Sequence, residues 1–225
     1  HLEKLHKAGF HVIPVTGRPA GWCELIARLW PVHGVVGENG AFYFRYDGST
    51  MRRAFARPKK DRKVDRAKLK AIWAEIKSRV PGAGIASDQF CRMFDLAVDF
   101  SEDVPPLPKK QIEQIVEIFH RHGAVAKVSN IHVNGWYGDY DKVSTCQKYL
   151  AQEFNLNESQ MKNQCAFIGD SPNDEPMFQF LDHTFGVANI KPFLDELKAK
   201  PSYITSQPEA EGFCEVANRL LVLKR

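Results

Sequence analysis

The stretch GDSPNDEPMF, residues 169–178, lies between two apolar runs and decides how the rest of the chain is organised. The run CAFI (165–168) leads into it and MFQFL (177–181) overlaps its end, which predicts a buried strand, a tight turn and a short helix. The turn carries Asp170 and Asp174. We expect both at the carboxyl end of a strand, where ligands bind in open α/β sheets.

Two crowded carboxylates repel each other unless a proton or a cation lies between them. Mg²⁺ is a hard cation that prefers oxygen ligands, so we interpret Asp170 and Asp174 as a candidate metal site. A simpler alternative is that Asp174 caps the helix after it, with Pro176 in the first turn of that helix. That alternative accounts for Asp174 but leaves Asp170, Ser171 and Asn173 unexplained.

Strands and helices alternate on both sides of this stretch. In the helix after Pro19, an apolar face carries Leu25, Ile26, Leu29 and Trp30. Alternation of strand and helix argues for a mostly parallel sheet with right-handed crossovers. We predict strands at residues 10–15, 32–36, 165–168, 184–188 and 202–205. A hairpin is predicted at 41–55, with its turn at 47–48. Helices are predicted through 2–8, 25–30, 143–154, 192–199 and 213–221.

A second pattern interrupts this alternation. The polar connector RPKKDRKVDR (57–66) is a candidate domain boundary, and the block after it reads helix, strand, strand, helix, strand, strand. Such a block predicts an antiparallel sheet covered on one face by two helices. The simplest architecture is an α/β core, residues 1–57 plus 138–225, with an inserted α+β module at 58–137.

Composition and charge narrow the class of protein. The chain has 225 residues, of which 44% are hydrophobic, and it has no apolar run long enough to span a membrane. Five cysteines without a CxxC pair favour neither zinc nor disulfides, so we predict a cytoplasmic protein. The net charge is +4, and residues 52–70 carry ten Lys/Arg against Asp61 and Asp65. Because this run has few stacking aromatics, we interpret it as a solvated face and not as a nucleic-acid site.

Two further positions point to the chemistry of phosphate esters. Thr16 ends a predicted strand and precedes a helix, and Gly17 beside it allows close backbone approach, so the pair forms a candidate anion site. The alternative is that Thr16 is only an N-cap. Lys142 lies in the first turn of a predicted helix, against the helix dipole, so an anionic group nearby would offset its charge. The alternative is a solvated surface lysine.

Together these motifs resemble the haloacid dehalogenase superfamily. The motifs are TGR, which begins at Thr16, GENGA at 37–41, the lysine Lys142, and GDSPNDEPMF at 169–178. Their order and the inserted module resemble the sugar-phosphate phosphatases with a large α/β cap, such as sucrose-phosphate, mannosyl-phosphoglycerate and trehalose-phosphate phosphatases. The resemblance implies a doubly wound, mostly parallel sheet with an inserted cap domain, residues 58–137.

The resemblance also implies roles for individual residues. Thr16, with Gly17 and Arg18, would bind the transferring phosphoryl group, and Lys142 would neutralise its oxygens. Asp170 would bind Mg²⁺ directly, and Asn173 and Asp174 would complete the shell around metal and phosphate. These residues fit the need of phosphoryl transfer for placed positive charge. The implied catalytic residues are Thr16, Lys142 and Asp170.

One family motif has no counterpart in the printed sequence. The family carries DxDxT at the end of a central strand, where the first aspartate is the nucleophile and the second a general acid/base. Here Asp139-Tyr140-Asp141 is the DxD nearest to that pattern, but no threonine follows it and it lies beside Lys142. The chain opens at His1 inside an uncapped amphipathic helix, so we expect the nucleophile strand to belong to a segment ahead of His1.

Residues of the cap are expected to choose the substrate. His132, Asn134 and Trp136 alternate onto one face of a predicted strand. Polar groups of this kind suit sugar hydroxyls, although the face of an antiparallel sheet that points to solvent has a similar pattern. Asp88, Arg92 and Asp95 flank the neighbouring strand.

The sequence thus leads to two main hypotheses, besides a weaker third one in which the basic run 52–70 binds nucleic acid. The first is a Mg²⁺-dependent phosphatase that acts on a sugar phosphate through an aspartyl-phosphate; the printed chain alone would then be inactive. The second is a non-catalytic module that binds Mg²⁺ and a phosphate ester without turnover.

Overall fold

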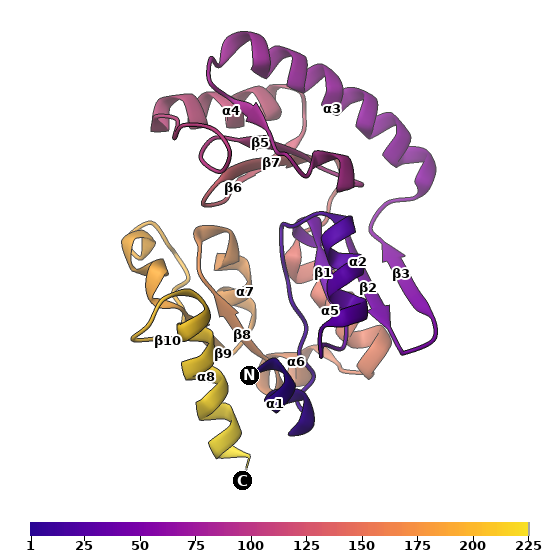
Figure 1. Cartoon of the computed structure of the whole chain (residues 1–225), viewed down its shortest axis with the longest axis vertical. Helices are drawn as coiled ribbons and strands as arrows, with labels where there is room; N and C mark the ends of the chain where they lie inside the picture. Colours follow the sequence, from indigo (N-terminus) through magenta and orange to yellow (C-terminus); the bar gives the residue numbers. More distant parts are fainter. Residues whose placement is uncertain (225) are drawn as a thin grey trace.

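The computed structural model describes residues 1–224 and divides into two units. The core unit contains both ends of the chain, and the cap unit, built from α3 to β7, lies over one end of it (Figure 1). The α/β fold class expected from the sequence is confirmed.

The second half of the core contains a parallel sheet. Its strands β8 (Ala166–Gly169), β9 (His183–Gly186) and β10 (Tyr203–Ile204) follow the order β10-β9-β8. The helices around it are α5 (Lys142–Phe154), α6 (Glu158–Gln164), α7 (Glu175–Phe180) and α8 (Glu209–Leu223). The predicted strand, turn and short helix at 165–181 are therefore present as β8, η3 (Pro172–Asp174) and α7.

The first half of the core contains α1 (Leu2–Lys7), α2 (Ala20–Leu29) and an antiparallel sheet, β1 (Val35–Gly37), β2 (Phe42–Tyr46) and β3 (Met51–Phe55). The hairpin β2–β3 turns at Asp47–Gly48, as predicted, and Gly48 has a φ of 95°. One hydrophobic cluster joins the two halves, since it contains Val36 of β1, Tyr149 of α5 and Phe167 of β8.

The strand predicted at residues 10–15 is not formed as a strand. The backbone oxygens of Val12 and Pro14 accept hydrogen bonds on one side of the segment only. A single parallel bridge joins Val15 to Val36. It runs between the two core sheets (Figure 1), and within residues 1–224 no strand pairing connects it to β8. A segment paired along one edge lacks the second row of bonds that would hold it as an interior strand.

The sequence placed the apolar face of α2 wrongly. The buried residues of α2 are Ala20, Cys23, Ile26 and Ala27, whereas Leu25 and Leu29 are exposed. Small residues face the sheet because α2 packs closely on β1 and β2: a Cβ at Gly37 would lie 2.6 Å from the Cys23 Sγ. The larger side chains therefore point outward.

The cap unit has the predicted order of elements. It contains α3 (Lys59–Arg79), β4 (Gly84–Ile85), β5 (Leu96–Asp99), α4 (Lys109–Arg121), β6 (Val125–Val128) and β7 (His132–Trp136), with a short 3₁₀ turn, η2 (Gln89–Cys91), before β5. The sheet is antiparallel in the order β4-β5-β7-β6. Both helices pack on one face through a core that includes Ile72, Ile115 and Phe119. The other face points toward the core unit (Figure 1).

Two local predictions near the C-terminal half need correction. Helix α6 was not predicted, although Asn157 caps it: its side chain accepts the Gln160 N–H at 2.9 Å in a capping box. The helix predicted at 192–199 is replaced by the 3₁₀ segment η4 (Ala188–Phe193), which contains Pro192. Turn residues follow at 194–196, so the segment does not continue as an α-helix.

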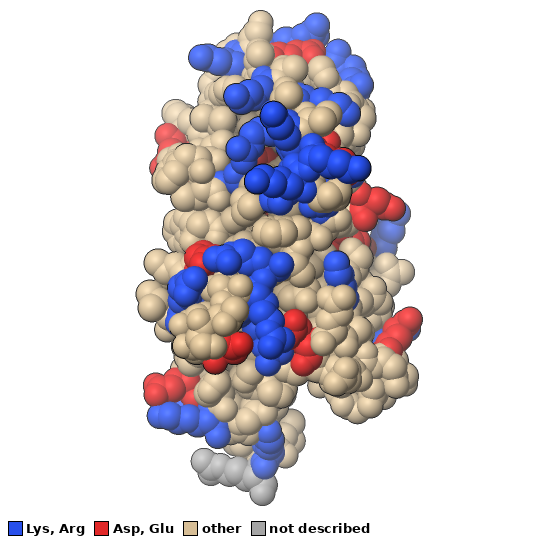
Figure 2. Space-filling view, turned by 90° about the vertical axis from the view of Figure 1, so that its right-hand side faces the viewer, with Lys and Arg blue, Asp and Glu red and all other residues tan. Residues whose placement is uncertain are grey.

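The basic run at 52–70 divides between α3 and β3. Figure 2 shows Lys and Arg side chains gathered in an upper group over the cap and a lower group over the core. Arg52 and Arg53 of β3 pair with Glu153 and Glu24, respectively. Paired arginines leave less charge for an external partner. The prediction that this run does not bind nucleic acid stays a prediction.

Within residues 1–224, no helix combines the length and the apolar character needed to cross a lipid bilayer.

Three histidines gather where the segment 10–15 meets β1. The ring centroids of His6 and His11 lie 4.8 and 4.3 Å from that of His33. Burial, followed by the neighbouring His11 and His6, lowers the pKa of His33 to about 4. The folded chain thus keeps His33 neutral where the unfolded chain binds a proton. Stability is therefore lost as the pH falls below about 6.5 toward 4.

We predict that the melting temperature falls between pH 7 and pH 5, and that the fall is smaller for His33→Gln. Thermal unfolding followed by circular dichroism at both pH values checks this. The control is His120→Gln, because His120 is exposed on α4. Equal pH dependence in all three proteins would contradict the assignment.

Candidate active site

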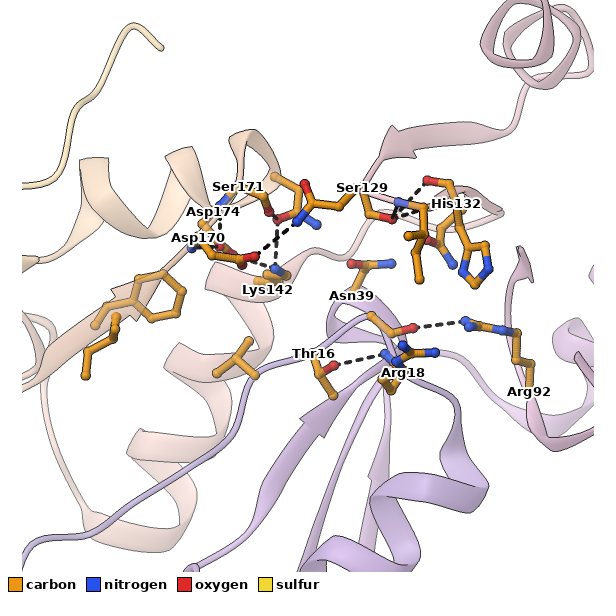
Figure 3. Close-up of a pocket in the computed structure, with 18 residues that line it drawn as sticks. Thr16, Arg18, Asn39, Arg92, Ser129, His132, Lys142, Asp170, Ser171 and Asp174 are labelled. Atoms are coloured by element: carbon orange, nitrogen blue, oxygen red, sulfur yellow. Dashed lines mark hydrogen bonds and ion pairs between the residues drawn. The ribbon is translucent and has the colours of Figure 1, made fainter. Parts of the chain in front are cut away.

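A cavity of about 400 Å³ lies between the two units (Figure 3). The core contributes the segment 15–18, Asn39, Lys142 and the loop after β8, and the cap contributes Arg92 and residues around the start of β7. All five core positions predicted to bind phosphate line this cavity: Thr16, Gly17, Arg18, Lys142 and Asn173. The structure therefore brings together side chains from both ends of the sequence.

The loop after β8 is held by the carboxylate of Asp174. Its Oδ2 accepts the backbone N–H of Asp170 at 3.0 Å and that of Ser171 at 3.4 Å. The loop needs Gly169, because a Cβ there would lie 2.7 Å from Asp174 Oδ2. Asp174 precedes α7, but its side chain makes no capping bond to that helix. The capping alternative is thus wrong: Asp174 bonds backward into the loop.

Lys142 is the cation of the site. It lies in the first turn of α5, which Asp141 caps by accepting the Ser144 N–H at 2.7 Å. Its Nζ lies 2.6 Å from Asp174 Oδ1 and 3.2 Å from Asn173 Oδ1. The side chain is only 10% exposed, so the alternative of a solvated surface lysine is wrong. Asp174 is the anionic partner that the unfavourable helix position required.

Asp170 is the carboxylate of the loop that forms no ion pair among residues 1–224. Its side chain instead accepts hydrogen bonds from two amides: Asn130 Nδ2 at 3.2 Å, from the cap, and Asn189 Nδ2 at 3.5 Å. Burial, and then the neighbouring Asp174, raise the pKa of Asp170 above its ordinary value. A raised pKa means that the carboxylate lacks full compensation for its charge. Asp170 is therefore the group in this loop most in need of a positive charge.

Thr16 lies on the opposite side of the cavity. Its Oγ1 accepts the backbone N–H of Arg18 at 3.0 Å, while α2 begins only at Ala20, with Pro19 as its N-cap. Thr16 therefore does not cap α2, and its hydroxyl hydrogen is available to an acceptor in the cavity. Gly17 packs against Asn39, since a Cβ at Gly17 would lie 3.1 Å from Asn39 Oδ1.

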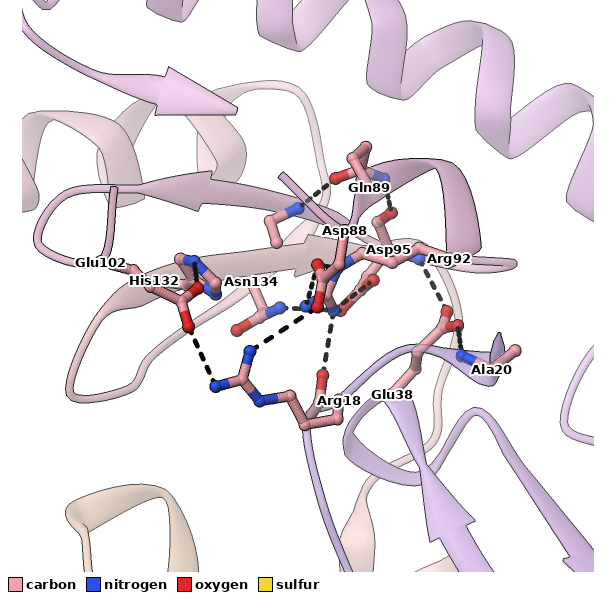
Figure 4. A network of polar contacts seen from close by, with 12 residues as sticks. Arg18, Ala20, Glu38, Asp88, Gln89, Arg92, Asp95, Glu102, His132 and Asn134 are labelled. Atoms are coloured by element: carbon pink, nitrogen blue, oxygen red, sulfur yellow. Dashed lines mark hydrogen bonds and ion pairs between the residues drawn. The ribbon is translucent and has the colours of Figure 1, made fainter. Parts of the chain in front are cut away.

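Arg18 makes contacts that the sequence did not indicate. Its guanidinium donates to Glu102 Oε1 at 3.0 Å and lies 3.6 Å from Asp88 Oδ2 (Figure 4). Both carboxylates belong to the cap, so Arg18 bridges the two units. Its phosphate-binding role stays a prediction.

Polar side chains of the cap form the upper wall of the cavity. His132, Asn134 and Arg92 are each at most 4% exposed, so the alternative of a solvent-facing sheet is wrong. Arg92 Nη1 lies 3.1 Å from both Asp95 oxygens, and Asn134 Nδ2 donates to Asp95 Oδ2 at 2.9 Å. Burial, and then Arg92, lower the pKa of His132. Trp136 instead packs into the hydrophobic cluster of the core.

Sequence reasoning missed Asn39 and Asn130 as cavity residues. Asn39 has a φ of 56°, a left-handed conformation that asparagine tolerates better than most residues. The Asn39-Gly40 pair after a buried strand was the available signal. Asn130 reaches Asp170 from the loop before β7, a contact between positions 40 residues apart that no local pattern indicates.

The donor set of the loop suits a hard cation. Asp170, Ser171 and Asn173 offer carboxylate, hydroxyl and amide oxygens, which Mg²⁺ prefers. Both oxygens of Asp174 are already bonded, to Lys142 and to backbone N–H groups. Within residues 1–224 no group of three or more His, Cys, Asp or Glu side chains is arranged around one point. A cation bound here would therefore rely on Asp170 and on neutral oxygens.

Comparisons with known proteins bear on the family and the fold. Residues 139–216, which contain Lys142 and the loop after β8, match the family model described as haloacid dehalogenase-like hydrolase. The fold is that of the haloacid dehalogenase-like hydrolases. The resemblance and the fold class derived from the motifs are confirmed.

Solved structures match almost the whole chain. A Thermoplasma acidophilum protein is 20% identical, with a TM-score of 0.70 over 97% of this chain and 87% of that protein. The sucrose-phosphatase of Synechocystis, solved with sucrose and phosphate, is 14% identical, with a TM-score of 0.64 over 97% and 91% of the two chains. A trehalose-6-phosphate phosphatase related protein is 16% identical, with a TM-score of 0.61 over 99% and 84%.

The buried pair of Lys142 and Asp174 leads to a stability prediction. Lys142→Met leaves the Asp174 carboxylate buried without its cation, and we expect the free energy of unfolding to fall by about 3 kcal/mol. Urea denaturation measures this. Lys148→Met, at an exposed position of the same helix, is the control and should change it by less than about 0.5 kcal/mol. Equal effects of both substitutions would contradict the pairing.

Proposed function

We propose that this chain belongs to a Mg²⁺-dependent phosphatase that hydrolyses a sugar phosphate or a similar small phosphate monoester. The observation that carries the proposal is the arrangement of Lys142 and the Thr16 hydroxyl around one cavity that is also lined by Asp170, a carboxylate whose charge is only partly compensated. A cation and a hydroxyl donor suit the oxygens of a phosphoryl group, and the carboxylate suits a metal ion.

The phosphoryl group is assigned to the space between Lys142 and Thr16. Lys142 carries a charge that is fixed in place, because Asp174 and Asn173 hold its Nζ. Thr16 is fixed by the Arg18 N–H, which leaves its own hydrogen to donate. Groups held in advance lose little free energy to reorganisation when negative charge moves onto the phosphoryl oxygens. Gly17 and Arg18 complete this side of the cavity.

Mg²⁺ is assigned to the loop after β8, with Asp170 as its direct ligand. Asn173 and Ser171 supply neutral oxygens nearby, and Asp174 shapes the loop by holding the Asp170 and Ser171 N–H groups. When bound, the ion supplies positive charge next to the phosphoryl oxygens. The raised pKa of Asp170 supports this assignment, since a bound cation would stabilise the ionised carboxylate that burial and Asp174 disfavour.

We infer that the nucleophile comes from a strand between β8 and the segment 10–15. The cavity reaches down between these two edges, because Val15, Phe167 and Ile168 line it. Within residues 1–224 no pairing joins the edges. A strand in this position would complete the sheet and end at the cavity, as the DxDxT strand of the family does.

The substrate's leaving group is proposed to be a neutral polyhydroxyl group. The arginines at the cap wall are already paired: Arg92 of the cap with Asp95 and Asp88, and Arg18 of the core with Glu102 of the cap. A second anionic group on the substrate would therefore gain little there. Asn134, His132 and Asn130 offer hydrogen-bond groups that suit hydroxyls.

The alternative is a binding module that holds Mg²⁺ and a phosphate ester without turnover. It uses the same residues and differs only in lacking a nucleophile. For either function we propose the cytoplasm as the compartment, because the five cysteines are free, as expected where thiols stay reduced.

The metal assignment predicts the effect of Asp170→Asn. We expect loss of more than about 90% of Mg²⁺-dependent turnover of p-nitrophenyl phosphate in the full-length protein, with an unchanged circular dichroism spectrum. In the printed chain, titration calorimetry with Mg²⁺ should show weaker binding for the variant. Asp182→Asn, at an exposed position away from the cavity, is the control. Wild-type Mg²⁺ affinity in Asp170→Asn would refute the assignment.

The nucleophile proposal is tested by comparing the printed chain with the same chain preceded by the residues that its gene encodes upstream. We expect hydrolysis of sugar phosphates only for the longer chain. Mg²⁺ and phosphate binding without turnover in both chains would favour the binding module. Full turnover by residues 1–225 alone would overturn the proposed origin of the nucleophile.

A further inference from the structure

Glu38 is a buried carboxylate outside the proposed reaction. It lies in the tight segment η1 (Glu38–Gly40) between β1 and β2 and is 0% exposed. Its φ is 42°, a left-handed conformation that costs free energy in a residue with a side chain. A buried polar group in a strained backbone is retained only where the surrounding contacts compensate for it.

Those contacts come from the backbones of both units (Figure 4). Glu38 Oε1 accepts the N–H of Ala20, in the core, and that of Met93, in the cap, both at 2.9 Å. Oε2 accepts the N–H of Phe94 at 2.6 Å and that of Asp95 at 3.3 Å. One side chain of the core therefore binds three successive backbone amides of the cap.

The cap segment 92–95 is attached to the core by two further contacts. Arg92 Nη1 donates to the backbone oxygen of Gly17 at 2.9 Å. The Phe94 ring belongs to the hydrophobic cluster of the core, 6.2 Å from the ring of Phe42. Glu38 lies between these contacts and fixes the backbone that carries them.

The same segment shapes the upper wall of the cavity. Asp95, whose N–H reaches Glu38, holds Asn134 through its side chain at 2.9 Å and Arg92 at 3.1 Å. Arg92 and Asn134 line the cavity. A shift of the segment would therefore move the wall that faces the leaving group of the substrate.

We propose that Glu38 is a positioning residue: its carboxylate clasps the cap segment 93–95 to the core and thereby sets the cap wall above the cavity. This role goes beyond the proposed function, because it concerns the arrangement of the two units and holds whether or not the site turns over a substrate. Loss of the clasp would leave three cap amides without an acceptor and would loosen the cap locally, while each unit keeps its own hydrophobic core.

The clasp responds to protons. Burial, and then the neighbouring Asp95, raise the pKa of Glu38 to about 8. The other titratable or charged groups that face it are Arg92 from the cap, Cys23 from α2 and Tyr140 ahead of α5. When the clasp opens, water restores the ordinary, lower pKa of Glu38. The closed arrangement is therefore favoured below that ordinary pKa and loses this advantage as the pH rises through about 8.

Hydrogen exchange of the printed chain tests the clasp directly. We expect Glu38→Ala to accelerate exchange at the amides of 93–95 by at least about tenfold, as loss of an acceptor for a buried donor predicts. Glu38→Gln has one acceptor oxygen instead of two, so it should accelerate exchange less than the alanine variant does. This second variant tests the clasp even if Glu38→Ala does not fold. Exchange in α8 should not change. The control is Glu24→Gln, because Glu24 pairs with Arg28 and Arg53 inside the core.

A pH series separates positioning from a general loss of stability. Relative to an unstructured peptide, protection at 93–95 should fall in the wild type between pH 7 and pH 9 and stay constant in Glu38→Gln, which has no carboxylate. Unchanged exchange at 93–95 in both variants would overturn the proposal. Equal acceleration at 93–95 and in α8 would also overturn it, since that result describes general unfolding. Identical pH series in wild type and Glu38→Gln would refute the link to protons.

Discussion

The buried carboxylate of Asp174 is the constraint on which the site depends. One of its oxygens holds the Lys142 ammonium, and the other holds the backbone at Asp170 and Ser171. Lys142 starts α5, whereas Asp170 ends β8, so a single side chain fixes a helix start against a strand end. Removing a buried carboxylate whose two oxygens are both bonded in this way destabilises the fold, because the Lys142 ammonium would keep only the neutral Asn173 Oδ1 as a partner.

The cavity owes its shape to the division of the chain into two units. The lower wall contains fixed charges, and the upper wall contains polar groups of the cap whose charges are already paired. Contacts between the units are concentrated at two places: Asn130 reaches Asp170, while Arg18, Arg92 and Glu38 join the opposite side. Buried polar networks of this kind fix one arrangement, since a partly satisfied network is costly.

Local sequence patterns predicted helices, strands and turns well wherever a few neighbouring residues decide the local structure. The turn at Asp47–Gly48, the cap order and the strand before Asp170 are present because turn residues and apolar periodicity act over a few positions. Prediction failed where packing decides. Cys23 and Ala27, not Leu25 and Leu29, face the sheet, because the helix lies too close for large side chains. The segment 10–15 has the composition of a strand but pairs along one edge only.

The sequence by itself determined the fold class and the chemistry of the candidate site. Thr16 and Asp170 were singled out because each follows an apolar run at a strand end, and Lys142 because it lies in the first turn of a helix, against the helix dipole. Only the tertiary structure decided how these groups are paired. It assigned Asp174 to Lys142, Arg18 to carboxylates of the cap, and Glu38 to the junction between the units. Such pairings join positions 32 to 84 residues apart, and their distances follow from packing, which local sequence does not encode.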